Sequence, residues 1–366
     1  MIYIIVFLLS LLFAYLANKS KSKTECVFLL FISALFPILL AGFRDITIGT
    51  DTGNYYGKLV QALRYNTFDQ FRKISDMEVG FVLFTYLCSK ITDSQIVYFI
   101  FVHSLVIIPV FMAIYKCRSF VNFANALYIF YFLFYCTTLN TTRQAIAVSI
   151  VLLSLSYLVY NEKCKSLILI FFAYLFHRTA ILFFFIYLIY IFTQKYNIRQ
   201  NLGKYFIAIT FILMFLYVLV NYFNILDVII GQRENYATYL LSVDDSNISK
   251  SSLILYLFVF ILIWRAYILY PNNLLSFFLI VSLFSIGMIF LTIIAPVFSR
   301  LNMYFNIIQV FSIPYILNNR FVAFNGKKKK LVSGFSKVTL FLYILILWYF
   351  SVIIKQSNQV YPYLFI

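Results

Sequence analysis

The chain has 366 residues, of which 63% are hydrophobic, 21% are aromatic and only 11% are charged. Soluble globular domains carry about 25% charged residues, so the composition excludes that class. The formal net charge of +17 does not indicate nucleic-acid binding, because the basic residues are spread over many short loops. Long apolar runs recur without period-2 alternation, which predicts an all-α polytopic membrane protein rather than a β-barrel.

The amino terminus has neither a basic region nor a small-residue cleavage site, so the first apolar run is expected to be a membrane span rather than a signal peptide. Five cysteines without C-x-x-C spacing predict neither a disulfide framework nor a metal site. We predict one polytopic domain over residues 1–366 with about 12 passes, some of them short or re-entrant. The passes are expected at about 2–17, 26–41, 95–115, 121–138, 144–160, 166–176, 179–192, 205–223, 251–269, 273–294, 301–318 and 336–354.

The distribution of Lys and Arg sets the predicted orientation, with both termini periplasmic. In this topology the cytoplasmic side holds 17 of the 29 basic residues and two of the 12 acidic residues. The outer side holds the other 12 basic residues and 10 acidic residues, mainly in outer loops at about 42–94 and 224–250. The asymmetry in Lys and Arg carries the inference, because acidic residues contribute little to orientation.

A polar stretch from Ala41 to Tyr56 interrupts the apolar sequence and places Arg44, Asp45 and Asp51 beside three glycines. One interpretation is that a membrane helix simply ends here. The other interpretation is a functional loop, which is favoured because further charged residues are predicted on the same side of the membrane.

Two later segments do not fit a simple span. Residues 78–90 are apolar but too short to cross the bilayer comfortably, so they are expected to form an interfacial or re-entrant helix on the outer face. Leu167–Phe192 is longer than one span needs and carries His177-Arg178 in its middle. Because an Arg at the bilayer centre costs several kcal/mol, we expect two short helices that meet at this pair.

The candidate site residues are predicted at outer membrane boundaries. Such residues usually line a cavity or contact a charged ligand. The alternative for Arg143 and Arg300 is snorkelling to lipid headgroups, and the alternative for His177 is a structural hydrogen bond. The candidates are Arg44, Asp51, Asn140, Arg143, Gln144, His177, Arg178, Arg300 and Tyr304.

An arginine cluster is suited to a pyrophosphate group, since the planar guanidinium pairs with phosphate oxygens through two hydrogen bonds and keeps its charge. Tyr304 shares a helix face with Arg300, and Asn302 and Asn306 share another face. These groups are candidates for binding sugar hydroxyls. His103, in the middle of an apolar span, is expected to be structural.

Several short motifs resemble, in order and spacing, those of the EpsG-like, Wzy-type polysaccharide polymerases, and the match runs from Met1 to about Pro314. Arg178 departs from the family pattern, where a Lys or a small polar residue is expected, so its role stays open. The motifs are Gly42-Phe43-Arg44, Gly49-Thr50-Asp51 with Tyr55-Tyr56, Glu78-x-Gly80-Phe81, Arg143-Gln144-x-x-Ala147, Phe176-His177 with Ala180, and Arg300-Leu301-x-x-Tyr304-Phe305.

The resemblance implies an enzyme of the bacterial inner membrane that joins undecaprenyl-diphosphate-linked oligosaccharide repeat units at the periplasmic face. It implies a chain-length regulator protein as a further partner and no cofactor. Such chemistry needs a cation clamp on the leaving diphosphate and a base near the acceptor hydroxyl. We assign the clamp to Arg143 and Arg300 and the base to Asp51 or His177, with Arg44 assisting substrate placement.

Two other functions fit parts of the pattern. A lipid-linked oligosaccharide flippase would also use cationic cavities, but it is expected to have two related halves and polar residues at mid-membrane depth. An O-antigen-ligase-like transferase would use outer-face arginines equally well. The outer loops contain no D-x-D motif, which favours a metal-independent transfer.

Overall fold

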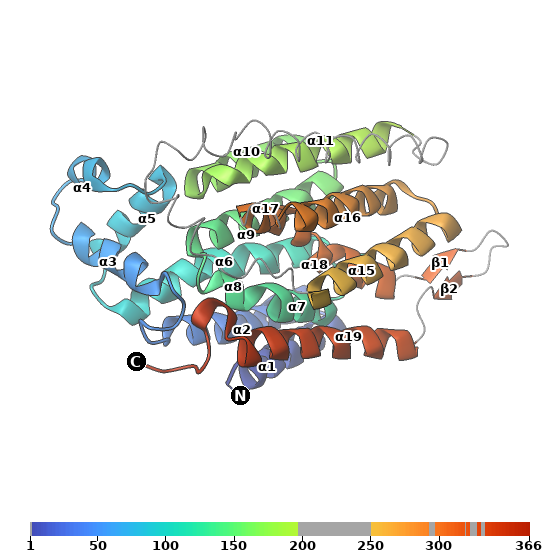
Figure 1. Ribbon diagram of the computed structural model, residues 1–366, viewed down its shortest axis with the longest axis horizontal. Coiled ribbons are helices and arrows are strands. Elements are labelled where there is room, and N and C mark those ends of the chain that lie inside the picture. The colour runs from blue at the N-terminus through green and yellow to red at the C-terminus, as the bar shows by residue number, and fades with distance from the viewer. Residues whose placement is uncertain (1, 197–249, 293–296, 319, 323–327, 331–333) are drawn as a thin grey trace. The chain divides into compact units, whose positions relative to one another are not determined.

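The computed structural model describes residues 2–196, 250–292, 297–318, 320–322, 328–330 and 334–366 (Figure 1). Within these ranges helices joined by turns and loops make up the chain, together with the antiparallel strands β1 (Arg320–Val322) and β2 (Lys328–Lys330) and an isolated bridge between Arg44 and Phe365. The chain forms two compact units. Unit 1 comprises Met1–Phe184, Gln309–Asn319 and Val332–Ile366, and unit 2 comprises Phe185–Ile308 and Arg320–Leu331.

Seven helical segments of the described chain are long and apolar enough to cross a membrane. Three shorter apolar helical segments accompany them: α5 (Val79–Ser89), Phe123–Thr138 and Leu253–Leu269. The predicted pass at 205–223 and the outer loop at 224–250 lie outside the described residues. The seven are α1 (Ile2–Lys19), α2 (Lys23–Gly42), α6 (Gln95–Lys116), α9 (Thr142–Val159), Arg178–Lys195, α16 (Asn273–Leu291) and Ser336–Ile354.

The remaining elements complete the two units. The segment Phe123–Thr138 consists of α7 (Phe123–Phe130), the π-helical η1 (Tyr131–Tyr135) and α8 (Cys136–Thr138), and Ser336–Ile354 combines most of α19 (Gly334–Trp348) with the π-helical η4 (Tyr349–Ile354). The other elements are α3 (Thr52–Ala62), α4 (Phe68–Ile74), α10 (Lys163–Phe176), η2 (Arg178–Ile181), α11 (Leu182–Lys195), α15 (Lys250–Leu269), α17 (Val297–Asn306), α18 (Gln309–Asn318) and η5 (Ser357–Gln359).

Small polar side chains join the long helices of unit 1. On α1 and α2, the Ser10 and Ser33 hydroxyls lie 2.8 Å apart, and each also donates to the carbonyl of the other residue. On α9 and α10, the Ser154 hydroxyl donates to the carbonyl of Ser166. Small residues allow close helix approach in membranes, and their hydroxyls satisfy each other there.

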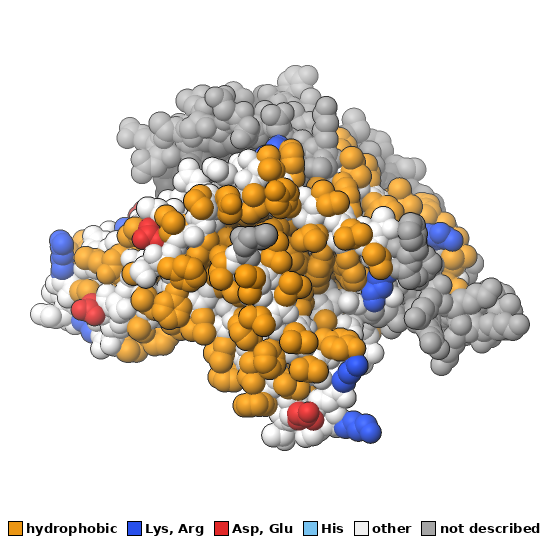
Figure 2. Space-filling view, turned by 90° about the horizontal axis from the view of Figure 1, so that it is seen from below, with side chains coloured by type: hydrophobic (Ala, Val, Ile, Leu, Met, Phe, Trp, Pro, Cys, Tyr) orange, Lys and Arg blue, Asp and Glu red, His pale blue; other side chains and the backbone are white. Residues whose placement is uncertain are grey.

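Figure 2 shows one face of the molecule covered mainly by hydrophobic side chains, as contact with lipid requires.

The predicted break at His177-Arg178 is confirmed. Helix α10 ends at Phe176, His177 adopts an extended conformation with φ −156° and ψ 122°, and a 3₁₀ turn over Arg178–Ile181 leads into α11. The short segment after Glu78 is also helical, since α5 covers only 11 residues. Its predicted place at the outer membrane boundary stays a prediction.

The helices of unit 1 bring their ends together in two groups, which we call the loop end and the basic end. The loop end holds the start of α9, the end of α10 and the short helices α3, α4 and α5, which lie side by side in Figure 1. The basic end holds the end of α1, the start of α2, the end of α6 and the turn between α9 and α10. There Lys116 forms an ion pair with Glu162, which also pairs with Lys165.

The last residues of the chain pack onto the loop end. The backbone N–H of Asp45 donates to the carbonyl of Leu364 at 2.9 Å, and the N–H of Ile366 donates to the carbonyl of Phe43 at 3.2 Å. On the first helix, the Tyr3 hydroxyl donates to the buried carbonyl of Val360 at 2.8 Å. The described start and end of the chain therefore lie at the same end of unit 1. This agrees with the expectation that both termini share one side of the membrane, while the periplasmic assignment stays a prediction.

Candidate functional site

The first loop of the loop end is held in a defined conformation by its own side chains. The Asp45 carboxylate accepts hydrogen bonds from the Thr47 backbone N–H at 2.9 Å and from its hydroxyl at 2.7 Å, and these bonds lower the pKa of Asp45. Gly49 has a φ of +87°, and a Cβ there would lie 3.0 Å from the Leu139 carbonyl oxygen. Glycine is therefore required at this position for both conformation and space.

Asn140, in the turn before α9, fixes the position of Asp51. Its Oδ1 atom accepts hydrogen bonds from the Asp51 backbone N–H at 3.0 Å and from the Thr50 hydroxyl. Two predicted site residues separated by 89 positions in the chain thus lie side by side. In this arrangement Asn140 acts on the backbone of the loop.

Glu78 joins two further predicted residues. Its Oε2 atom accepts a charge-assisted hydrogen bond from Arg143 Nη1, and its Oε1 atom accepts one from His177 Nδ1 at 2.9 Å. The three side chains are mostly covered, with exposed fractions of 12% for Glu78, 26% for Arg143 and 18% for His177. We call these three residues the Glu78 cluster.

The charge state of Glu78 follows from its neighbours. Burial raises the pKa of this carboxyl, but the His177 hydrogen bond and the Arg143 charge together outweigh burial and lower the pKa to about 2. Glu78 is therefore ionised near neutral pH and can only accept hydrogen bonds. Consequently His177 Nδ1 carries the proton in this bond, and in the neutral imidazole the Nε2 atom is an acceptor.

Arg143 also acts on side chains of the first loop region. Burial raises the pKa of Tyr55, and the nearby Arg143 charge opposes this change while the Asp51 charge adds to it. Arg143 also contributes to the lowered pKa of Asp76, whose main cause is a hydrogen bond from Lys58. The Arg143 Nε atom is buried and has no hydrogen-bond partner among the described residues. The guanidinium therefore retains a donor for a further acceptor.

Arg44 lies in the interior of unit 1 with no exposed surface. Its Nη1 atom is 3.0 Å from His103 Nε2, and its guanidinium carbon lies 4.3 Å from the centre of the Phe99 ring. His103 Nδ1 in turn donates to the Phe99 carbonyl, so Nε2 is free to accept from Arg44. Burial lowers the pKa of Arg44 to about 10, which still leaves it charged. The structural role expected for His103 includes holding this arginine.

Two other candidates of unit 1 differ in exposure. Gln144 is buried at the start of α9, with 3% of its surface exposed. Arg178 is exposed and opens the 3₁₀ turn that follows His177. Neither side chain belongs to the Glu78 cluster.

Arg300 and Tyr304 belong to unit 2, on α17. Tyr304 is fully buried, whereas Arg300 is partly exposed. Asn302 donates to the Ser285 carbonyl at 3.1 Å, and Asn306 donates to the Tyr256 hydroxyl at 2.9 Å. The two asparagines thus tie α17 to α16 and α15. A shared clamp of Arg143 and Arg300 stays a prediction.

Sequence reasoning missed Glu78 as a site residue. It treated Glu78 only as part of a short motif, although an acid directly before an apolar helix was a usable signal. It also missed the carboxyl-terminal segment, which carries no charged motif. Among the described residues, no group of three or more His, Cys, Asp or Glu side chains is placed to hold a metal ion.

The fold and the site define a polytopic α-helical membrane protein with a cluster of paired charges at one end of its helices. A family model of the EpsG family matches residues 27–365. The chain therefore belongs to the EpsG family, a family of polysaccharide polymerase-like membrane proteins. No curated protein and no solved structure matches the chain.

Proposed function

We propose that the protein is a glycosyltransferase of the bacterial inner membrane that polymerises undecaprenyl-diphosphate-linked oligosaccharide repeat units into O-antigen or capsular polysaccharide. The loop end faces the periplasm in this proposal. The observation that carries it is the Glu78 cluster beside the Asp51 loop. Four separate family motifs contribute Asp51, Glu78, Arg143 and His177 to this one end of unit 1.

The reaction assigns a role to each member of the cluster. The bond between the anomeric carbon of the donor chain and the diphosphate oxygen breaks, and the diphosphate leaves with the electron pair. The acceptor hydroxyl forms the new glycosidic bond and gives its proton to a base. Arg143, with a buried Nε donor left over, stabilises the charge that develops on the diphosphate.

His177 is better placed than Glu78 to be the base. A general base works best when its pKa is near the operating pH, and the pKa of Glu78 is far below it. Glu78 instead orients the imidazole through Nδ1, which leaves Nε2 to take the proton. Asp51 then binds the acceptor or supplies an alternative base, and Arg44 acts from the interior by holding the loop.

The test is reconstitution of the purified protein in liposomes with a lipid-linked repeat unit as the only substrate. We expect a ladder of longer lipid-linked glycans, lost in His177→Ala and reduced in Asp51→Asn. Transport of the lipid across the bilayer without new glycosidic bonds would overturn the proposal in favour of a flippase. Transfer of single repeat units only to an added lipid A core would favour the ligase-like function.

A separate variant tests the cation clamp that Arg143 and Arg300 are proposed to form. Arg300→Ala in the same liposomes is expected to abolish the ladder if Arg300 grips the diphosphate together with Arg143. A normal ladder from Arg300→Ala would limit the clamp to unit 1, and Asn302→Ala, on the same helix, is the control for disturbance of α17.

A further inference from the structure

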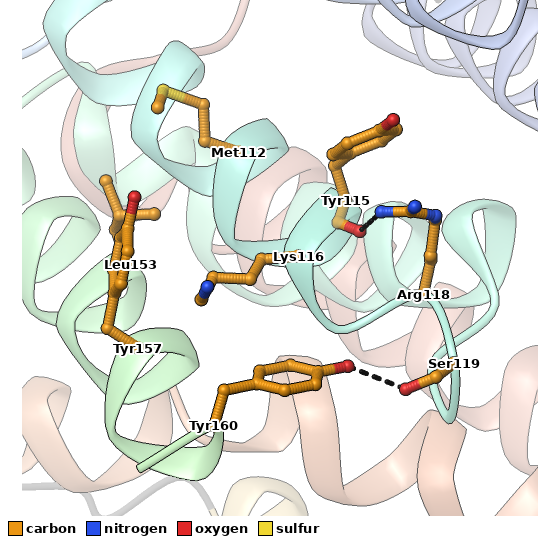
Figure 3. A pocket seen from close by; sticks show the side chains of 8 residues that line it. All are labelled: Met112, Tyr115, Lys116, Arg118, Ser119, Leu153, Tyr157 and Tyr160. Atoms are coloured by element: carbon orange, nitrogen blue, oxygen red, sulfur yellow. Dashed lines mark hydrogen bonds between the residues drawn. The ribbon is translucent and has the colours of Figure 1, made fainter. Parts of the chain in front are cut away.

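A pocket lies at the basic end of unit 1, at the opposite end of α6 and α9 from the Glu78 cluster. It has a volume of about 580 Å³ and opens between the last turns of α6 and α9 (Figure 3). The proposed polymerase reaction makes no use of this pocket. The pocket is lined by Met112, Tyr115, Lys116, Arg118, Ser119, Leu153, Tyr157 and Tyr160.

Aromatic rings position the cations of this pocket. Lys116 Nζ lies 4.2 Å from the centre of the Tyr157 ring and 5.1 Å from that of Tyr160, and the Arg118 guanidinium lies 4.2 Å from the centre of the Tyr115 ring. Cation–π contacts hold a charge in place without neutralising it. The pocket therefore presents fixed positive charge.

One acid lies close to these cations. Glu162 pairs with both Lys116 and Lys165, and these hydrogen bonds lower the pKa of Glu162, so it stays ionised. Arg118 also lines the pocket and pairs with no acid among the described residues, since its Nη1 atom donates to the Tyr115 carbonyl at 3.1 Å. The local charge remains positive and favours an anionic ligand.

The order of residues along the helices distinguishes a lipid from a free anion. Met112 lies one helical turn before Lys116, and Leu153 lies one turn before Tyr157. The apolar side chains therefore line the part of the pocket nearer the middle of the helices, and the cations line the part at their ends. Met112 is 49% exposed, as contact with an acyl chain requires.

A second hollow of about 300 Å³ adjoins the first, because Tyr115 and Arg118 line both. It adds Lys21 and Lys23, and with them one acid, Glu25, which accepts a hydrogen bond from the lining Ser20 at 2.7 Å. Asn18 also lines this hollow, and the buried Nδ2 atom of Asn18 has no hydrogen-bond partner among the described residues. A buried donor without a partner, in a hollow lined by the three cations Lys21, Lys23 and Arg118, favours an oxygen-rich acceptor.

We propose that the basic end binds the headgroup of an anionic phospholipid. Its phosphate lies at Lys116 and Arg118, its acyl chains lie along Met112 and Leu153, and further headgroup oxygens reach Asn18. Basic pockets between membrane helices on the cytoplasmic side bind such headgroups, and the Lys and Arg distribution predicts that side here. This site is independent of the polymerase proposal.

The experiment is native mass spectrometry of the detergent-purified full chain, titrated with phosphatidylglycerol or phosphatidylcholine. Each cation near an anionic headgroup contributes enough for about a fivefold change in affinity. We expect saturable, preferential binding of phosphatidylglycerol, weakened about fivefold by Arg118→Gln and about thirtyfold by Lys116→Gln combined with Arg118→Gln. The single variant keeps the Lys116–Glu162 pair and guards against a loss that reflects misfolding.

The matched control is Lys90→Gln at the loop end, which removes a lysine that also lies over a tyrosine, Tyr86, at 4.7 Å. We expect this variant to bind phosphatidylglycerol like the unaltered protein. An equal loss in Lys90→Gln would overturn the proposal, as would equal binding of both lipids. Displacement of phosphatidylglycerol by inorganic phosphate would overturn it too, because that result would define a free-anion site.

Discussion

The loop end and the basic end of unit 1 use similar charged residues in different ways. At the loop end, Glu78 is largely covered and binds two partners that come from distant parts of the chain. At the basic end, Glu162 is more exposed and pairs with lysines that also rest on tyrosine rings. Covered pairs are costly to break, whereas exposed pairs contribute little. The difference separates a largely covered charge cluster at the loop end from more exposed charge pairs at the basic end.

The first prediction concerns the side of the membrane that each end of unit 1 faces. Cys164 is the exposed cysteine among the five, so Cys164→Ala gives a background with low labelling. In intact cells, an impermeant thiol reagent is expected to label Lys73→Cys at the loop end and not Lys21→Cys at the basic end. Both positions are exposed, so accessibility alone does not separate them. The reverse pattern would invert the topology and remove the loop end from the periplasm.

The second prediction compares one arginine from each end. Loss of an oriented donor at a developing charge costs about 10²–10³ in rate, so Arg143→Ala is expected to abolish long-chain glycan in cells. Arg118→Ala should leave the glycan ladder intact, and Arg143→Lys should give a sparser ladder because lysine lacks the planar fork. An epitope tag checks that each variant reaches the membrane at a normal level. A normal ladder in Arg143→Ala would mean that this arginine only pairs with Glu78 and takes no part in the reaction.

Several features of the molecule were accessible from the sequence alone. The break at His177-Arg178 was predictable because the apolar run is too long for one span and the pair is too costly at mid-membrane depth. The pairing of Glu78 was not predictable, since its partners lie 65 and 99 positions away and no local pattern links them.

The interior position of Arg44 could not be predicted from the sequence, for a different reason. A lone arginine is expected at the membrane boundary, whereas the structure holds Arg44 in the interior through His103 and the Phe99 ring. The carboxyl-terminal segment was missed because it binds the first loop mostly through backbone groups, which leave no side-chain pattern in the sequence.

The third prediction concerns stability and pH. The pKa of Glu78 falls from 4.5 to about 2 on folding, so its ionised form stabilises the fold above pH 4.5. This contribution, about 3 kcal/mol, is lost as the pH falls from 4.5 towards 2. Urea unfolding in detergent should give Glu78→Gln a lower free energy of unfolding than the unaltered protein at pH 7. This difference should shrink as the pH falls towards 2. Glu162→Gln should not lower the free energy of unfolding comparably at pH 7. Equal effects of the two substitutions would contradict the contrast between the loop end and the basic end.

The smallest expected effect concerns the segment that holds the first loop in place. Removal of Pro362–Ile366 deletes the backbone hydrogen bonds to Phe43 and Asp45 and the bond from the Tyr363 hydroxyl to the Leu40 carbonyl. Each such bond contributes about 1 kcal/mol, so the loop that carries Asp51 should loosen while the helices stay folded. We expect about tenfold less polymer in liposomes, and Tyr363→Phe, which loses one bond, should lose less. Unchanged polymer after truncation would show that the remaining contacts, from Asn140 to the loop and from the Gly49 N–H to the Gln359 carbonyl, suffice to position Asp51.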